Sequence, residues 1–530
     1  MQHDHPLTLQ HVLWRMRTMN AGRQVVTKTE DGVDRISFGD LARRVDRLAH
    51  ALTALGVRPG DRIATFSWNT QRHLELYLAV PCLGAVLHTL NIRLFPEQLT
   101  YVANHAQDRF LFADSSLDDV LDPVAPSFET VQQRFDMDDG YEALLAAAPD
   151  EPFAWPELDD RSAAGLCYTS GTTGNPKGVL YSHRSNVLHA LAKCLADAEG
   201  IRHGDRVMPV VPMFHANAWG FPYACAMMGA DLILPSRFVT PAALAGLIET
   251  EHVTIAGGVP TVWLDLLHFA DEHHPDLSSV QRLVCGGSAV PEALMRAFED
   301  RHGVHMVQAW GMTETSPLAS VSHAPPGAAG DEAMAARTRQ GRPLPLVESR
   351  IVADDGSELP WDGEATGELE VRGPWVASEY YEDPAGEEKF HDGWLRTGDI
   401  ASIDATGSIR LSDRSKDVIK SGGEWISSVD LENAIMGHPA VAECAVIAMP
   451  HERWAERPLA CVVVQPGESL TAQDIRGHLA DQVAKWWLPD EVVFIDEVPK
   501  TSVGKFDKKV LRTRLSDGEL LPAKAESAAS

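Results

Sequence analysis

The sequence predicts an α/β protein: a large N-terminal domain of helix-covered β-sheets with a small β-barrel-like piece, then a small mobile α+β domain. Three observations support this. Amphipathic helical segments alternate with short apolar runs along much of the chain, short β-runs rich in Gly and Asp begin beyond Arg372, and a separate α+β pattern follows Asp413. Alternation of strands with helices is typical of parallel sheets covered on their faces by helices.

Individual segments show this alternation. Residues 41–57 have apolar positions at helical spacing and end beside a glycine, and residues 58–68 predict a turn followed by a strand. Residues 71–91 predict a helix that leads into a buried strand. Further strands between amphipathic helices are predicted at 231–235, 253–259 and 282–287.

The changes in composition and in predicted secondary structure along the chain give the expected domain division. Residues 1–412 form the large domain, β-rich from about 340 to 412, and residues 413–416 form a hinge. The small C-terminal domain follows at 417–515. Residues 516–530 are expected to be a flexible tail, because they are polar and lie at a terminus.

Composition narrows the class of protein. A formal net charge of −29 over 530 residues, spread without long blocks, argues against a nucleic-acid binder and means that an anionic substrate needs local positive groups. Seven dispersed cysteines without a C-x-x-C pair predict reduced thiols in a cytoplasmic protein. The chain starts without an apolar signal region and has no run near the ~20 apolar residues that span a bilayer, so no integral membrane contact is expected.

The stretch YTSGTTGNPKGV, residues 168–179, differs most from ordinary core or surface. Its glycines allow backbone N–H groups to approach an oxyanion, its hydroxyl residues add donors, and Lys177 adds a mobile charge. It is not a Walker A loop, because position 176 is proline and position 178 is glycine. The residues alone leave two interpretations: a polyphosphate-binding loop or a flexible surface turn.

Four more segments follow in order along the chain: WGMTETSP (310–317), GWLRTGD (393–399), SDRSKDVIKSGGEWIS (412–427) and PKTSVGKFDKKVLR (499–512). Together with TSGTTGNPKG they resemble the phosphate, adenine–magnesium, ribose, hinge and C-terminal lysine motifs of the adenylate-forming superfamily. The sequence is most similar to those of bacterial medium- and long-chain fatty-acyl-CoA ligases, from about residue 10 to about residue 515. The resemblance implies that family's fold and an enzyme that uses ATP, Mg²⁺ and CoA to convert a carboxylic acid into acyl-CoA, AMP and pyrophosphate.

The resemblance also implies the nucleotide site. Its ATP-binding residues would be Thr169, Ser170, Gly171, Thr172, Thr173, Gly174, Lys177, Gly286, Gly287, Ser288, Ala309, Trp310, Gly311, Asp399 and Arg414. Glu314 and Thr173 would bind Mg²⁺, and Thr313 would contact the α-phosphate. Trp310 replaces the tyrosine that the family usually has. Without the motifs, Trp310 would be read as core, Glu314 as a surface carboxylate, and the glycine and TGD segments as turns.

Catalysis is implied to need two states of the small domain. Lys505 would face the carboxylate and α-phosphate during adenylation only, where its charge stabilises the transition state. Rotation about the hinge residue Lys416 would then bring Lys420 toward the active site and place Gly422, Gly423 and Glu424 at the CoA tunnel. The neighbouring cations Lys508, Lys509, Arg512 and Arg514 are interpreted as a solvated basic face.

The expected acid is linear and apolar, of medium to long chain. The resemblance implies that His215 borders its carboxylate, that Trp219 gates an apolar tunnel, and that Gly257, Val259 and Pro260 line the wall; a core role for Trp219 is the alternative. Short thioether and aryl acids stay open, because close relatives differ by few wall residues. An acyl-AMP ligase and a catalytically silent nucleotide-binding protein are the competing functions, and a homodimer is the expected assembly.

Overall fold

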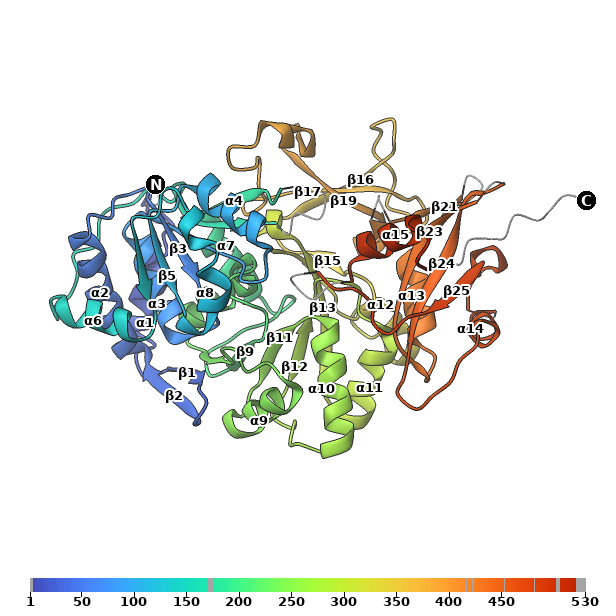
Figure 1. The fold of residues 1–530 in the computed structure, drawn as a ribbon, viewed down its shortest axis with the longest axis horizontal. Coiled ribbons are helices and arrows are strands. Elements are labelled where there is room, and N and C mark those ends of the chain that lie inside the picture. The colour runs from blue at the N-terminus through green and yellow to red at the C-terminus, as the bar shows by residue number, and fades with distance from the viewer. Residues whose placement is uncertain are drawn as a thin grey trace, which may run out of the picture.

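The computed structural model describes residues 3–169, 175–414, 417–421, 424–451, 453–480, 482–501 and 506–520. Figure 1 shows two helix-covered sheets side by side, a third sheet above them, and the C-terminal part of the chain at the far side from the N-terminus. No helix in this part of the chain combines the length and the hydropathy that crossing a membrane requires.

The larger sheet is mainly parallel. Its strands, in spatial order, are β15 (Arg342–Pro343), β14 (Leu318–Val321), β13 (His305–Gly311), β12 (Arg282–Cys285), β11 (Ile255–Gly258), β9 (Arg206–Pro209), β10 (Asp231–Leu234), β1 (Gln24–Lys28) and β2 (Val33–Ser37). From β1 to β13 all neighbours are parallel, whereas β2, β14 and β15 are antiparallel at the two edges. The parallel strands are short and largely buried, as expected for strands covered on both faces.

The smaller sheet carries the predicted phosphate loop. Its order is β6 (Gln133–Asp136), β5 (Phe110–Ala113), β3 (Arg62–Phe66), β4 (Val86–Thr89), β7 (Ala163–Tyr168) and β8 (Gly178–Ser182). The last two strands form an antiparallel hairpin in which Tyr168 pairs with Gly178. The glycine-rich segment therefore connects two paired strands in the sequence, and the chain continues after it as β8.

The two sheets and their helices stack in five layers. Side chains alternate between the two faces of a strand, so each sheet packs against helices on both sides. One apolar cluster lies between the sheets, and others lie on their outer faces. The middle helices are α1 (Gln10–Thr18), α2 (Phe38–Ala54), α3 (Gln71–Cys82), α7 (His183–Lys193) and α8 (Phe221–Met228). On the outer faces lie α4 (Pro96–Ala106), α9 (Pro241–Glu251), α10 (Pro260–His273) and α11 (Glu292–His302).

Shorter helices occur at the surface and in loops. They are η1 (Ser115–Leu117), α5 (Asp118–Leu121), η2 (Ala125–Ser127), α6 (Asp139–Ala147), η3 (Ala216–Gly220), η4 (Thr313–Thr315), α12 (Gly330–Arg337), η5 (Pro384–Lys389) and η6 (Lys485–Trp487). Among them, η3 and η4 contain residues that the motifs single out.

A third, antiparallel sheet contains β16 (Glu348–Val352), β17 (Gly367–Arg372), β18 (Phe390–His391), β19 (Trp394–Ile403) and β20 (Ile409–Arg414). It is the β-rich piece that the sequence predicts after about residue 340. Within it, Asp399 of β19 pairs with Arg414 of β20, so the backbone places these two predicted ribose-binding residues opposite each other.

The last part of the chain forms a separate α+β unit. Its sheet contains β22 (Glu424–Ile426), β21 (Ile419–Ser421), β24 (Ala455–Val464), β23 (Val441–His451) and β25 (Glu491–Phe494), with helices α13 (Ser428–Met436), α14 (Ala472–Leu479) and α15 (Lys508–Ser516). Two apolar clusters form its own core. The chain passes from the third sheet into this unit between β20 and β21.

The predicted α/β architecture is confirmed, including the predicted strands at β3, β4, β10, β11 and β12. The seven cysteines are free, and six of them are buried. The expected tail begins too early, however. Leu520 is buried against Leu511 and Val498, because an apolar side chain directly after α15 packs back onto the small domain's core. Residues 521–530 lie outside the described residues.

Two buried histidines predict a pH dependence of stability. Burial lowers the pKa of both His73 and His183 to about 4. The unfolded chain protonates them near 6.5 and so binds more protons than the native state as pH falls; the stabilisation present above pH 6.5 is lost toward pH 4. We expect each to reduce the free energy of unfolding by about 2 kcal/mol between pH 6.5 and pH 5. In urea unfolding, His73→Gln should lose about 2 kcal/mol less than wild type over this range; equal losses would contradict the assignment.

Candidate active site

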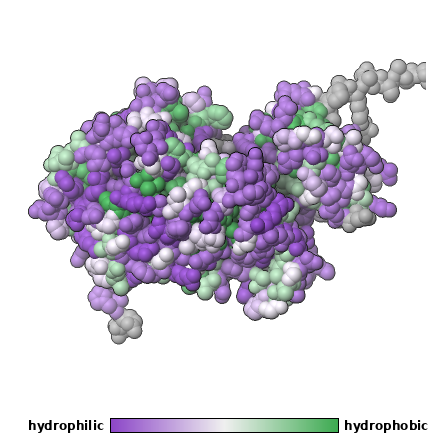
Figure 2. All heavy atoms as spheres, turned by 90° about the horizontal axis from the view of Figure 1, so that it is seen from below, coloured by the Kyte–Doolittle hydropathy of each residue, from purple (hydrophilic) through white to green (hydrophobic). Residues whose placement is uncertain are grey.

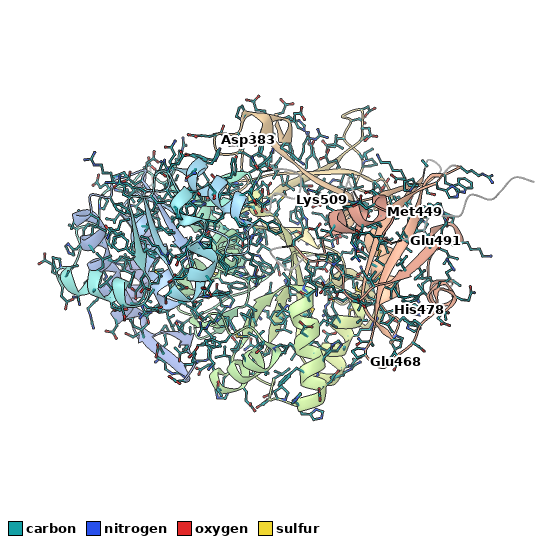
Figure 3. All side chains as sticks on the ribbon, in the orientation of Figure 1. Asp383, Met449, Glu468, His478, Glu491 and Lys509 are labelled. Carbon is teal, nitrogen blue, oxygen red and sulfur yellow. The ribbon has the colours of Figure 1, made fainter. Side chains whose placement is uncertain are left out.

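A cavity of about 300 Å³ lies between the large sheets and the small domain. On the large-domain side, residues from separate motifs line it: Gly287, Ser288, Ala309, Trp310, Gly311 and Asp399. On the other side lie Thr501, Phe506, Lys508, Lys509 and Arg512. Figure 3 shows Lys509 on the side of the small domain that faces the large sheets, with Glu491 and His478 farther away. The fold therefore gathers predicted nucleotide-binding residues from the 286–288, 309–311 and 397–399 segments at one place.

Trp310 and Asp399 are linked within this cavity. Trp310 is near the end of β13, Asp399 lies in β19, and the Trp310 Nε1–H donates a hydrogen bond of 2.9 Å to Asp399 Oδ2. Both residues are buried. The Asp399 backbone N–H also donates to Thr397 Oγ1 at 3.1 Å. The sequence predicted a stacking role for the Trp310 ring; the structure adds that its N–H orients the carboxylate predicted to bind ribose.

We expect Trp310→Phe to weaken ATP use without removing the aromatic face. A hydrogen bond to a charged group contributes about 1.5–3 kcal/mol, so the KM for ATP should rise by roughly tenfold or more. Because Asp399 would be less well oriented, the preference for ATP over 2′-deoxy-ATP should shrink as well. Steady-state kinetics with both nucleotides test this, with Trp361→Phe, at an exposed tryptophan, as the control. An unchanged preference would mean that the hydrogen bond does not serve ribose binding.

The predicted magnesium ligand Glu314 lies in a second cluster. It is 5% exposed, and its Oε1 accepts a hydrogen bond of 2.6 Å from the hydroxyl of Tyr380. Burial and the charge of Glu314 raise the pKa of Tyr380, so the hydroxyl stays a donor. Lys177 Nζ lies 4.8 Å from the centre of the Tyr380 ring and 3.3 Å from Asp383 Oδ2. Tyr380 thus lies between the carboxylate of one motif and the cation of another.

A segment that the sequence analysis did not single out, residues 375–383, holds these motifs together. Backbone hydrogen bonds of 2.7 and 2.8 Å join Ala377 N to Glu314 O and Tyr381 N to Gly178 O. Ser316 Oγ donates to the Trp375 carbonyl at 2.8 Å, and Tyr181 donates to the Thr313 carbonyl at 2.7 Å. The adjacent aromatics in PWVASEYYEDP were the signal that was available, but aromatic residues at such spacing are more often core.

The ends of the predicted phosphate loop are closed by paired hydrogen bonds. Thr169 N donates to Lys177 O at 2.9 Å, and Lys177 N donates to Thr169 Oγ1 at 3.0 Å. The loop residues between them fall partly outside the described part of the chain. The predicted site residues that lie outside it are Ser170, Gly171, Thr172, Thr173, Gly174, Lys416, Gly422, Gly423 and Lys505, together with the side chains of Arg414 and Glu424.

The chemistry of Glu314 fits Mg²⁺. With Oε1 accepting from Tyr380, its Oε2 is the carboxylate oxygen that remains for a cation. A magnesium ion at a nucleotide usually takes only one or two protein carboxylates, because phosphate oxygens and water complete its shell. The described residues contain no cluster of three or more His, Cys, Asp or Glu side chains that could hold a metal by themselves.

The loop of the predicted catalytic lysine begins and ends at the cavity. Thr501 and Phe506, which flank residues 502–505, both line it. A β-bridge joins Lys500 to Phe506, and Asp507 N donates to Pro499 O at 2.7 Å, so the two ends of the loop are tied together. Lys505 lies between these ends in the sequence.

The interpretation of Lys508 as part of a solvated basic face was wrong. Its side chain is only 11% exposed, and its Nζ lies 2.8 Å from Glu432 Oε1. Burial lowers the pKa of Lys508, but the negative charges of Glu432 and Asp413 outweigh this effect and raise it. Arg512 likewise pairs with Asp417. These pairs join α15, which begins directly after the residues that flank Lys505, to α13 and to Asp417 ahead of β21. A charge pattern in the sequence cannot show such pairs.

Lys420 and Glu424 lie away from the cavity lining. They belong to the β21–β22 hairpin, in which Lys420 pairs with Trp425 and Ser421 with Glu424. Lys420 is exposed, and its backbone N–H donates to Glu456 Oε2 at 2.7 Å. The structure therefore places the flanks of Lys505 beside the nucleotide cavity and the predicted CoA hairpin elsewhere on the small domain.

The residues predicted to bind the acid lie around the C-terminal ends of β11 and β12. His215 and Trp219 are half-buried. A turn follows His215, in which Ala216 to Trp219 all have left-handed φ angles between 43° and 55°. A Cβ added to Gly286 would lie 3.3 Å from the Trp219 ring. Gly257 ends up in β11, Val259 follows it, and Pro260 begins α10. Left-handed backbone costs about 1–2 kcal/mol per non-glycine residue, and such strain concentrates at functional sites.

Comparisons with known proteins identify the family of this chain. A model of the AMP-binding enzyme family matches residues 14–381, and a model of the AMP-binding enzyme C-terminal domain matches residues 430–505. The chain belongs to the AMP-binding enzyme family, with the α/β fold of adenylate-forming enzymes. It is an ATP-binding, AMP-forming acid–thiol ligase, an acyl-CoA synthetase.

Three relatives show how near the likeness is. The chain is 47% identical to a 3-methylmercaptopropionyl-CoA ligase of Ruegeria pomeroyi, over 92% of this chain and 93% of the relative. It is 45% identical to a long-chain-fatty-acid–CoA ligase of Thermus thermophilus, over 96% of each. It is 43% identical to a medium-chain-fatty-acid–CoA ligase of Ectopseudomonas oleovorans, over 94% of each.

Solved structures show the same fold over nearly the whole chain. An anthranilate CoA ligase in complex with anthranoyl-AMP superposes with a TM-score of 0.88 at 25% identity, covering 97% of this chain and 99% of its own. ATP-bound MatB from Rhodopseudomonas palustris gives a TM-score of 0.84 at 26% identity, covering 97% and 100%.

Proposed function

We propose that the enzyme activates a linear, apolar carboxylic acid with ATP and Mg²⁺ and transfers the acyl group to CoA. The observation that carries this proposal is the cavity in which Trp310 and Asp399 of the large domain face Thr501 and Phe506, the flanks of the Lys505 loop. Two anions, ATP and a carboxylate, have to meet in a chain of net charge −29. The site therefore needs cations at the point of reaction.

In the first half-reaction, the carboxylate attacks the α-phosphorus and pyrophosphate leaves. We assign the loop from Thr169 to Lys177 to the β- and γ-phosphates, and Asp399 with Arg414 to the ribose. Glu314 and Thr173 would hold Mg²⁺, which neutralises charge on the phosphate oxygens when bound. Thr313 would contact the α-phosphate. Lys505 would stabilise the charge that develops between carboxylate and α-phosphorus.

In the second half-reaction, the CoA thiolate attacks the acyl-adenylate carbonyl and AMP leaves. We propose that the small domain, residues 417–515, rotates about the hinge at 413–416 with Lys416 as its pivot. Lys505 then withdraws, Lys420 approaches, and Gly422, Gly423 and Glu424 border the pantetheine chain. The position of the Lys505 flanks at the cavity supports the interpretation that the described arrangement corresponds to the first half-reaction.

The acid itself is proposed from the apolar surroundings of Trp219 and Gly257. The sequence predicts a medium to long chain, like the substrates named for two of the relatives. A second candidate is a short thioether acid, as named for the Ruegeria relative, and one observation favours it: the ring of Phe221 covers Gly257. Aryl acids fit less well, because the rings of Trp219 and Phe221 already occupy the space beside Gly286 and Gly257.

One assay tests the proposal. The purified protein is incubated with ATP, Mg²⁺ and acids of graded length, with and without CoA, and AMP, pyrophosphate and acyl-CoA are measured. We expect acyl-CoA only when all components are present. AMP release that never responds to CoA would instead indicate an acyl-AMP ligase, and no turnover with any acid would indicate a silent nucleotide-binding protein. Sedimentation analysis tests the proposed homodimer.

A further inference from the structure

Two aromatic rings lie directly on backbone at the ends of β11 and β12. A Cβ added to Gly286 would lie 3.3 Å from the Trp219 ring, and one added to Gly257 would lie 2.8 Å from Cζ of Phe221. Trp219 and Phe221 are two positions apart, at the end of η3 and the start of α8. If the acid lies beside these glycines, as proposed above, the ring of Trp219 flanks it at Gly286 and the ring of Phe221 fills the space beside Gly257.

The two rings differ in how firmly they are held. Trp219 is half-buried and belongs to the left-handed turn. Phe221 has no exposed surface and belongs to the cluster between the two sheets. Its ring therefore has no solvent-filled space into which it can turn, because protein interiors are close-packed.

A buried ion pair lies behind Phe221. Lys193 Nζ is 4.0 Å from the centre of the Phe221 ring and 2.5 Å from Glu199 Oε2, and both charged side chains are fully buried. A desolvated ammonium over an aromatic face is strongly attracted to it. Displacing the ring would leave the cation facing an alkyl chain, which offers no compensating interaction. The ring is thus held between Gly257 and a cation that cannot reach water.

We propose that Phe221 ends the acyl-binding site and restricts the enzyme to short linear apolar acids, of about the size of butanoate or 3-(methylthio)propanoate. This deepens the proposed function and depends on it, because it takes Trp219 and Gly257 as neighbours of the acyl chain. Phe221 acts as a specificity-determining residue through the volume of its ring. Lys193 and Glu199 act through it, as positioning residues.

The test compares chain-length profiles. Values of kcat/KM are measured for 3-(methylthio)propanoate, butanoate, hexanoate, octanoate and dodecanoate with wild type and Phe221→Ala. Wild type should prefer the short acids. Since one methylene group in an apolar pocket changes kcat/KM by roughly tenfold or more, the octanoate-to-butanoate ratio should rise at least about tenfold in Phe221→Ala. Phe221→Leu, which removes less volume, provides an intermediate variant if the alanine variant is unstable.

Phe298→Ala is the matched control. It also removes a fully buried phenylalanine side chain, from α11, which lies on the opposite face of the larger sheet from α8. It should lower stability while leaving the ratio unchanged. A wild-type preference for dodecanoate, or a ratio that does not change in either Phe221 variant, would overturn the inference. These outcomes differ from failure of the proposed function, in which wild type forms no acyl-CoA from any acid.

Discussion

Lys505→Ala should lower the rate of acyl-adenylate formation by about 10²–10³-fold, while thioester formation from supplied acyl-AMP and CoA stays close to the wild-type rate. The magnitude is that of removing one preorganised group that stabilises charge in a transition state. The selectivity follows from the proposed rotation, because a lysine on a moving loop can serve only the half-reaction in which that loop faces the nucleotide. The loop's flanking residues Thr501 and Phe506 line the cavity in the described arrangement.

The two half-reactions are measured separately, as pyrophosphate release in a single turnover and as acyl-CoA formation from synthetic acyl-AMP. Lys485→Ala removes an exposed lysine of the same small domain and should leave both rates unchanged. Equal loss in both half-reactions for Lys505→Ala would show that this lysine has a general structural role. An unchanged adenylation rate would remove Lys505 from the mechanism altogether.

Glu314→Gln should also reduce adenylation by about 10²–10³-fold and weaken the dependence of the rate on Mg²⁺ concentration. The glutamine oxygen can still accept the hydrogen bond from Tyr380, so the geometry of the 375–383 segment should be kept. The lost charge is then the main change. The measurement is the adenylation rate over a Mg²⁺ titration, with thermal unfolding to verify that the fold is intact.

Glu370→Gln is a suitable control for this effect. Glu370 is also a buried carboxylate, 2% exposed, and its oxygens pair with Arg350 and His391 in the third sheet. Its loss should affect stability and leave the Mg²⁺ dependence as in wild type. If Glu314→Gln and Glu370→Gln lower activity alike with the same Mg²⁺ profile, Glu314 is not the magnesium ligand.

The acidic charge of the chain bears on how the substrates reach the site. Figure 2 shows a face that is mostly hydrophilic, with small scattered hydrophobic patches. A net charge of −29 repels ATP, carboxylates and CoA, and salt screens this repulsion at separations greater than about 10 Å. We therefore expect binding to depend on local cations, with Lys177 as the proposed one at the phosphate loop, and on hydrogen-bond donors of the loops.

Much of the candidate site could be predicted because its residues lie in compact motifs. Residues 309–311 end β13, and residues 397–399 lie within β19, so the local sequence determines the strand on which each segment lies. The glycine-rich loop was recognisable from its composition, whereas the hairpin of β7 and β8 that carries it was not predicted. The structure brings Gly287, Trp310 and Asp399 to one cavity, as the motif order implies.

Other features depended on contacts between segments far apart in sequence. Tyr380 lies 66 positions from Glu314 and more than that from Lys177, yet it contacts both. In the sequence, Lys508 is one of several neighbouring cations. In the structure it forms a largely buried ion pair with Glu432, which lies 76 positions away. No periodicity or spacing reports such pairs, because hydrogen bonds and ion pairs form wherever the folded chain places donor beside acceptor.

The sequence by itself determined the α/β class, the motifs that carry ATP chemistry and the family, since periodicity, turn residues and loop composition are local properties. Only the tertiary structure decided which aromatic ring covers Gly257, how Trp310 orients Asp399, and which loop of the small domain faces the cavity. The physical reason is that packing fixes side-chain positions through many weak contacts between distant segments, and these contacts have no signature in any one stretch of residues.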